Sequence, residues 1–253
     1  MTASSLYKKC PKCGVDSAGL DVCPACGLIF AKYLRAKFAT PQTRPRRSVE
    51  TDGEDSFMTR AKQLVFYVPE QTDSIVVYAR AVLLAAIAFY GVRLALMDIP
   101  SWEMSASLIH LPMVPIHEFG HLFFRPFGEF MTLLGGSLFQ IGLPLVFGGI
   151  FLVKNRDPFA ASVMLWWSAV AVMDVAPYIY DAWAPQHILL TGRTGDTGAH
   201  DFIDTLGDLG LLHKAQPIGR GVHVLGVVGM LAALAWGAYI LLHQYRTSTR
   251  VSS

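Results

Sequence analysis

Charged residues are scarce in this sequence, and they are unevenly distributed. Asp, Glu, Lys and Arg make up 16% of the 253 residues, against about 25% in an average globular protein. Residues 1–47 hold nine Lys and Arg against two Asp, whereas residues 48–75 hold six acidic and two basic residues. The rest of the chain consists of apolar segments with short polar breaks. This distribution argues against an ordinary soluble protein and indicates an integral membrane protein with a polar N-terminal part.

The sequence also lacks an apolar stretch near its beginning, and it lacks cysteine after position 26. Because the first 30 residues are polar, no cleavable signal peptide is expected, and the N-terminus should stay in the cytoplasm. The basic N-terminal segment favours the same orientation by the positive-inside rule. Since cytoplasmic thiols remain reduced, the cysteines are not expected to form disulfides.

All four cysteines belong to two Cys-x-x-Cys pairs, each followed by a glycine: Cys10 with Cys13, and Cys23 with Cys26. This spacing suits two tight turns that present four thiolates to one Zn²⁺ ion. Iron is the alternative metal for such a site. We therefore predict a zinc ribbon over residues 1–30, with a structural zinc ion and a possible protein partner. Without interleaved aromatic and basic residues, the pattern does not indicate nucleic-acid binding.

The apolar segments predict an all-α polytopic membrane protein with about five transmembrane helices. Residues 31–75 are expected to form a basic and then acidic linker followed by an interfacial segment, and residues 76–245 the transmembrane domain. The expected spans are 76–97, 104–124, 130–153, 159–182 and 222–243. In this topology the second and fourth spans both run toward the cytoplasm, and their ends face it.

One stretch of the second expected span, His117-Glu118-Phe119-Gly120-His121, places three ionisable residues in apolar surroundings. Residues four apart share a helix face, so His117 and His121 can bind one metal ion together. Glu118 would then lie beside the metal, where a general base for water is needed. Each ionisable residue in a membrane helix costs about 2.5–3.5 kcal/mol to insert. Metal binding would explain why this stretch contains three such residues in five positions. Histidines hydrogen-bonded to neighbouring helices are the alternative.

A catalytic zinc ion normally has three protein ligands and one open position, so this stretch is one ligand short. Asp181 is the first candidate, because it ends a span parallel to that of the histidines at a matching depth. His200 and Asp201, in the loop that follows, are the alternative as ligands or as partners of a ligand. Asp174 lies on a different helix face from Asp181. It could line a substrate groove or form a hydrogen bond between helices.

These residues resemble the motifs of the site-2 protease family of intramembrane zinc metalloproteases. The first family motif, His-Glu-x-x-His, is matched in full by His117, Glu118 and His121. The second, Asn-x-x-Pro…Asp-Gly, is matched imperfectly by Asp174, Pro177, Asp181 and Ala182. Asp stands there in place of Asn, and Ala in place of Gly. The family often carries a PDZ or CBS regulatory domain, and this chain has the predicted zinc ribbon at its N-terminus instead.

The resemblance covers about residues 104–183 and implies an enzyme of regulated intramembrane proteolysis. Such a zinc metallopeptidase, a hydrolase, cleaves a peptide bond in or near a transmembrane segment of a membrane protein. It implies Glu118 as the catalytic base, Asp181 as the third zinc ligand, and a catalytic zinc ion besides the structural one. The alternative is a non-catalytic membrane scaffold or sensor whose zinc ribbon binds a partner. A closed metal site with His200 as a further ligand would favour that alternative.

Overall fold

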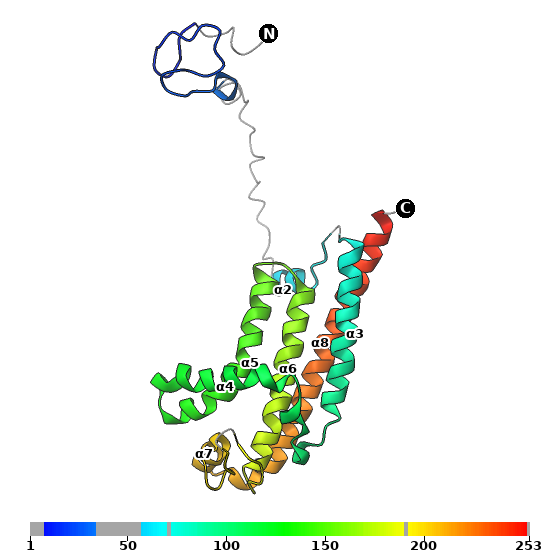
Figure 1. Cartoon of the computed structure of the whole chain (residues 1–253). Helices are drawn as coiled ribbons and strands as arrows, with labels where there is room; N and C mark the ends of the chain where they lie inside the picture. The colour runs from blue at the N-terminus through cyan, green and yellow to red at the C-terminus, as the bar shows by residue number, and fades with distance from the viewer. Residues whose placement is uncertain (1–7, 34–56, 70–71, 190–191, 252–253) are drawn as a thin grey trace. The chain divides into compact units, whose positions relative to one another are not determined.

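The computed structural model describes residues 8–33, 57–69, 72–189 and 192–251 (Figure 1). The chain forms two compact units, Met1–Asp55 and Ser56–Ser253. Most of the predicted linker lies outside the described residues. Its last part contains the helix α2 (Phe57–Val65), where the sequence predicts an interfacial segment.

The N-terminal unit contains two similar turns, each built on a Cys-x-x-Cys-Gly stretch. The Gly14 amide donates to the Cys10 carbonyl, and the Gly27 amide donates to the Cys23 carbonyl, both at 2.9 Å. Both glycines have left-handed backbone angles, φ 75° and 69°, which a side chain would disfavour. A β-bridge closes each turn, pairing Lys9 with Asp16 in the first and Val22 with Ile29 in the second. The unit is therefore an internal repeat of one cysteine-bearing turn.

Four helices of the second unit are long and apolar enough to cross a membrane. They are α3 (Ser74–Ala95), α5 (Glu129–Val153), α6 (Pro158–Asp181) and α8 (Ala215–Val251), with the last apolar stretch beginning at Leu212. The predicted class, an all-α polytopic membrane protein, is confirmed. The number of such helices among the described residues is four and not five.

The predicted second span, residues 104–124, is the one that is wrong. It begins in the short helix η3 (Glu103–Ala106) and continues as α4 (His110–Phe124), which has 15 residues. A helix of that length measures about 22 Å, less than the roughly 30 Å of a hydrocarbon core. The chain then reverses through η4 (Arg125–Phe127) and Gly128, whose φ of 97° favours glycine. α4 consequently lies across the direction of α3, α6 and α8 (Figure 1).

An even number of spans brings the beginning of α3 and the end of α8 to the same end of the unit. Arg80, early in α3, forms an ion pair of 2.6 Å with Asp157, the residue that caps α6. Arg80 also donates to Gln244, late in α8, at 3.0 Å. Five spans would have placed these two ends apart. The opposite end of the unit holds the end of α6 and the short helix α7 (Asp201–Asp208).

The helix at the centre of this unit is α6. Of its most apolar stretch 67% is buried inside the protein, compared with 11% for α3, because α5 and α8 both pack against it. Glycine permits the close approach of α8, since a Cβ on Gly226 would lie 2.5 Å from Met173 Cγ and 2.8 Å from the Ala169 carbonyl oxygen. The polar residues of α6 are thereby enclosed by protein.

Candidate metal centre

The cysteines of the N-terminal unit form one group of side chains that could hold a metal ion. Their four Sγ atoms lie within 4.8 Å of one another. The Cys10–Cys26 and Cys13–Cys23 sulfur separations are 3.7 and 3.5 Å. These exceed the disulfide bond length of about 2.05 Å. They are close to the roughly 3.8 Å between sulfurs around a tetrahedral ion with metal–sulfur bonds of about 2.3 Å.

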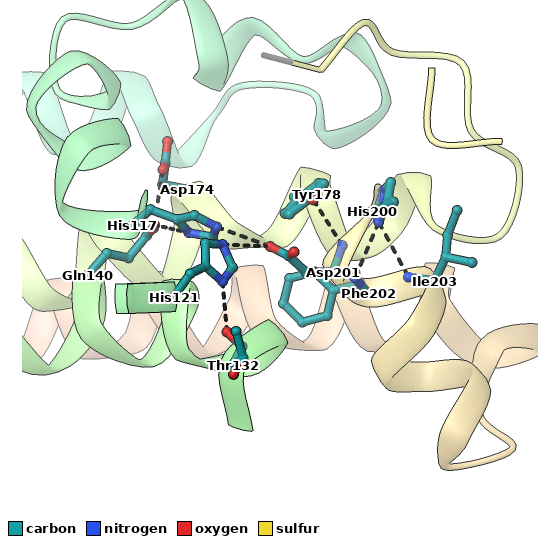
Figure 2. Close-up of polar contacts among 10 residues, drawn as sticks. All are labelled: His117, His121, Thr132, Gln140, Asp174, Tyr178, His200, Asp201, Phe202 and Ile203. Atoms are coloured by element: carbon teal, nitrogen blue, oxygen red, sulfur yellow. Dashed lines mark hydrogen bonds and ion pairs between the residues drawn. The ribbon is translucent and has the colours of Figure 1, made fainter. Parts of the chain in front are cut away.

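A second group lies in the membrane unit and comprises His117, His121 and Asp201 (Figure 2). The two histidines share one face of α4, as their spacing predicts, with ring centroids 4.7 Å apart. The Asp201 Oδ2 atom lies 3.1 Å from His117 Nε2 and 3.4 Å from His121 Nε2. The three side chains are 15%, 22% and 13% exposed, respectively. One potential ligand atom from each residue therefore converges on a common, largely buried point.

The other ring nitrogen of each histidine is held by α5. His117 Nδ1 lies 2.9 Å from Gln140 Oε1, and His121 Nδ1 lies 2.7 Å from the Thr132 carbonyl oxygen. Both oxygens accept hydrogen bonds, so each Nδ1 carries a proton and donates it. The Nε2 atoms that face Asp201 are then the ones that present lone pairs in the neutral rings. Such an arrangement fixes both the tautomer and the orientation of a metal-binding histidine.

Two Nε2 lone pairs and a carboxylate oxygen repel one another unless a cation lies between them. The pKa values of His121 and Asp201 both shift in the direction that favours positive charge at this point. The hydrogen bond with Asp201 raises the pKa of His121 to about 9. Burial alone would raise the pKa of Asp201, but hydrogen bonds from His117 and His121 lower it to about 2. A divalent metal ion could meet the same electrostatic demand.

Asp201 reaches the histidines because it is the first residue of α7. His200 caps that helix, since its Nδ1 accepts from the Phe202 and Ile203 amides at 3.3 Å each. The Asp201 amide donates to the hydroxyl oxygen of Tyr178, on α6, at 3.1 Å. Figure 2 shows these contacts beside the two histidine rings. The start of α7 is thus anchored both to its own cap and to the central helix.

The expected placement of Asp181 beside the histidines is wrong. Its Oδ1 accepts from the Gln186 amide at 3.0 Å and lies 3.8 Å from His187 Nε2, and its Oδ2 lies 3.8 Å from His200 Nε2. Asp181 is the last residue of α6, and Tyr178, about one turn earlier, is the residue at the level of the cluster. The carboxylate beside the histidines is that of Asp201, on α7. Asp201 was one of the two alternative candidates in the sequence.

Asp174 does not line an open groove. Its side chain is 4% exposed, and its two carboxylate oxygens are occupied by His110 Nδ1 at 2.9 Å and Gln140 Nε2 at 3.3 Å. Because Gln140 also accepts from His117, Asp174 supports the orientation of that ring through one intervening side chain. It is the hydrogen-bonded interhelical residue that the sequence offered as the second possibility.

Glu118 follows His117 on α4 and is exposed. It is not among the three converging residues. Its charge nevertheless contributes to the raised pKa of His121. Glu118 is therefore close enough to interact electrostatically with the cluster, but it is not part of it.

The sequence did not identify Gln140, Thr132 or Tyr178 as functional residues. Gln140 and Thr132 act on the histidines because α4 and α5 pack closely, with Gly120 of α4 against the backbone of Gly135. The glycines of α5 permit this close helix packing. They carried no information on which polar residue would face which histidine.

The close packing of α5 on His117 gives a testable prediction. A Cβ on Gly136 would lie 2.5 Å from His117 Nε2, so the ring would have to move. We expect Gly136→Ala to weaken zinc binding at this cluster by about 10–100-fold, comparable to the loss of a residue that orients a ligand. The measurement is zinc titration of the purified chain. Gly142→Ala, on the same helix with nothing within 4 Å of its Cβ, should bind like wild type; equal affinities would contradict this placement of His117.

Comparison with known proteins gives no further guide. The chain matches no protein-family model, no curated protein and no solved structure. A functional assignment therefore depends on the motif and on the side-chain geometry described above.

Proposed function

We propose that this chain is a zinc-dependent intramembrane peptidase that hydrolyses a peptide bond in or near a transmembrane segment of a membrane protein. The observation that carries the proposal is the convergence of His117 Nε2, His121 Nε2 and Asp201 Oδ2 within a helical membrane unit. Two histidines and one carboxylate, with a fourth position left for water, are typical of catalytic zinc sites. The resemblance of the His117–His121 stretch to the site-2 protease motif supports the same activity.

The proposed reaction assigns a role to each residue. A zinc ion held by the three residues would lower the pKa of water to about 7 and polarise the scissile carbonyl. Glu118 accepts the proton of the attacking water and donates it to the leaving amine, so that peptide and water become a carboxylic acid and an amine. Gln140 and Thr132 keep the two imidazole rings oriented.

The position of His200 argues for catalysis over the scaffold alternative. A structural zinc site is closed by four protein ligands, whereas a catalytic site keeps one position open. His200 Nδ1 is occupied as the cap of α7, and Nε2 is directed at Asp181. His200 is therefore not available as a fourth ligand. In this proposal the Cys₄ group binds a structural zinc ion, and its unit serves a protein partner.

The proposed orientation keeps the N-terminus in the cytoplasm, as its basic residues favour. The cluster lies near the end of α6, away from the beginning of α3, so this orientation puts it toward the other face of the membrane. That revises the expectation of a site facing the cytoplasm, which depended on five spans. The substrate is a membrane helix that unwinds locally, because an extended strand exposes peptide bonds that a helix shields.

The proposal is tested with purified full-length chain, single-span membrane proteins and an unfolded soluble protein as candidate substrates. We expect cleavage that a zinc chelator stops and added Zn²⁺ restores. Because chelation also acts on the cysteine unit, the control is the double variant His117→Ala/His121→Ala, which should be inactive without chelator. Equal cleavage by wild type and the double variant would overturn the proposed active site.

A further inference from the structure

Two buried polar atoms face each other where α6 ends and α7 begins. Asp181 Oδ2 and His200 Nε2 are 3.8 Å apart, on side chains that are 3% and 0% exposed. Neither atom has a hydrogen-bond partner among the described residues. A buried carboxylate oxygen and a buried ring nitrogen are costly when unpaired. Each atom is of the kind that could satisfy the other.

The remaining polar atoms of both side chains are already occupied, which fixes their roles. His200 Nδ1 accepts from the Phe202 and Ile203 amides, so this nitrogen presents a lone pair. The proton of the neutral ring is then on Nε2. Asp181 Oδ1 accepts from the Gln186 amide, which leaves Oδ2 as a free acceptor. The facing atoms are therefore a donor and an acceptor, and a shift of less than 1 Å would bring them within hydrogen-bond range.

The Asp181–His200 pair is connected to Asp201 through Tyr178. The His200 ring packs on the Tyr178 ring, with centroids 4.3 Å apart, and Tyr178 accepts the amide hydrogen of Asp201. A Cβ on Gly195 would lie 2.5 Å from His200 Cδ2, so the loop before α7 also packs tightly on the ring. A ring held in this way fixes the first turn of α7, and with it the direction of the Asp201 side chain.

We propose that Asp181 and His200 are positioning residues that hold Asp201 at the metal. Asp181 binds the His200 ring, His200 caps α7, and the cap sets where Asp201 Oδ2 lies relative to His117 and His121. Neither residue is itself a ligand. The inference rests on the proposed metal site and adds to it the residues that bring its third ligand to α4.

The test measures metal binding in the full chain and does not require proteolysis. Zinc affinity and the visible spectrum of bound Co²⁺ are recorded for each variant, and the ribbon contribution is subtracted with His117→Ala/His121→Ala. Asp181→Ala should lower zinc affinity by about 10–100-fold and alter the Co²⁺ spectrum. Asp181→Asn retains an acceptor oxygen for His200 Nε2 and should restore affinity to within about threefold of wild type.

A double-variant comparison then asks whether the two residues act together. His200→Asn retains a side-chain oxygen that can cap α7 but loses the contact with Asp181. The zinc affinity of Asp181→Ala/His200→Asn should be no lower than that of the single variant with the lower affinity. Both substitutions remove the same contact between Asp181 and His200, so their effects should not add.

Three outcomes contradict the inference in distinguishable ways. Wild-type affinity and spectrum in Asp181→Ala would overturn it while leaving the metal site in place. Independent, multiplying losses in the double variant would show that the two residues do not act as a pair. Absence of any metal beyond the ribbon in the wild-type chain would overturn this inference and the proposed function together.

Discussion

Asp201→Ala is expected to remove the metal from the membrane unit as completely as His117→Ala. Among the described residues, Asp201 provides the one carboxylate oxygen of the cluster, at 3.1 and 3.4 Å from the two Nε2 atoms. Two histidines alone are fewer ligands than zinc sites use. The loss of affinity should therefore exceed the roughly 100-fold upper range for residues that only orient a ligand. Metal content of the full-length chain should fall to that of the His117→Ala/His121→Ala variant.

The same helix offers a matched control for this experiment. Asp204 is also acidic and in the first turn of α7, but it is exposed and outside the cluster. Asp204→Ala changes the charge by the same amount and should retain full metal content. Full metal content in Asp201→Ala, combined with its complete loss in Asp181→Ala, would return the ligand role to the end of α6.

Glu118→Gln is expected to retain the metal and to lose proteolysis. The side chain is not among the three converging residues, so replacing its carboxylate with an amide leaves every proposed ligand in place. An amide cannot accept and return the proton of the attacking water. General acid–base catalysis typically contributes about 10²–10⁴-fold, and the cleavage rate should fall by at least that factor. Cleavage is followed by appearance of product fragments, and metal content is measured on the same preparation.

Glu129 provides the comparison for Glu118. It is an exposed glutamate at the first position of α5, just beyond the turn that follows α4. Glu129→Gln should retain both metal and activity. A Glu118→Gln chain that cleaves at the wild-type rate would remove Glu118 from the mechanism. A Glu118→Gln chain that has lost its metal would instead make Glu118 a ligand.

Properties that depend on neighbouring residues were determined by the sequence alone. The apolar segments determine a helical membrane unit, because an isolated backbone in lipid must satisfy its own hydrogen bonds. The spacing of His117 and His121 places both rings on one helix face, since that face repeats every three to four residues. The two Cys-x-x-Cys-Gly stretches likewise determine two turns, and the observed sulfur separations of 3.5 and 3.7 Å agree with one shared metal ion.

Tertiary structure decided the properties that depend on distant residues. Residues 104–124 are apolar enough to be taken for a span, but the reversal at η4 makes α4 a short helix that packs on α5. Which carboxylate meets the histidines depends on how the segment between α6 and α7 returns to the central helix. Asp181 and Asp201 were both chemically suitable, and only the packing of the His200 ring and the start of α7 on Tyr178 places one of them at His117. Helix periodicity is a local property of one segment. The register between packed helices depends on side chains that are far apart in the chain, so the spacing of residues within one segment does not encode that register.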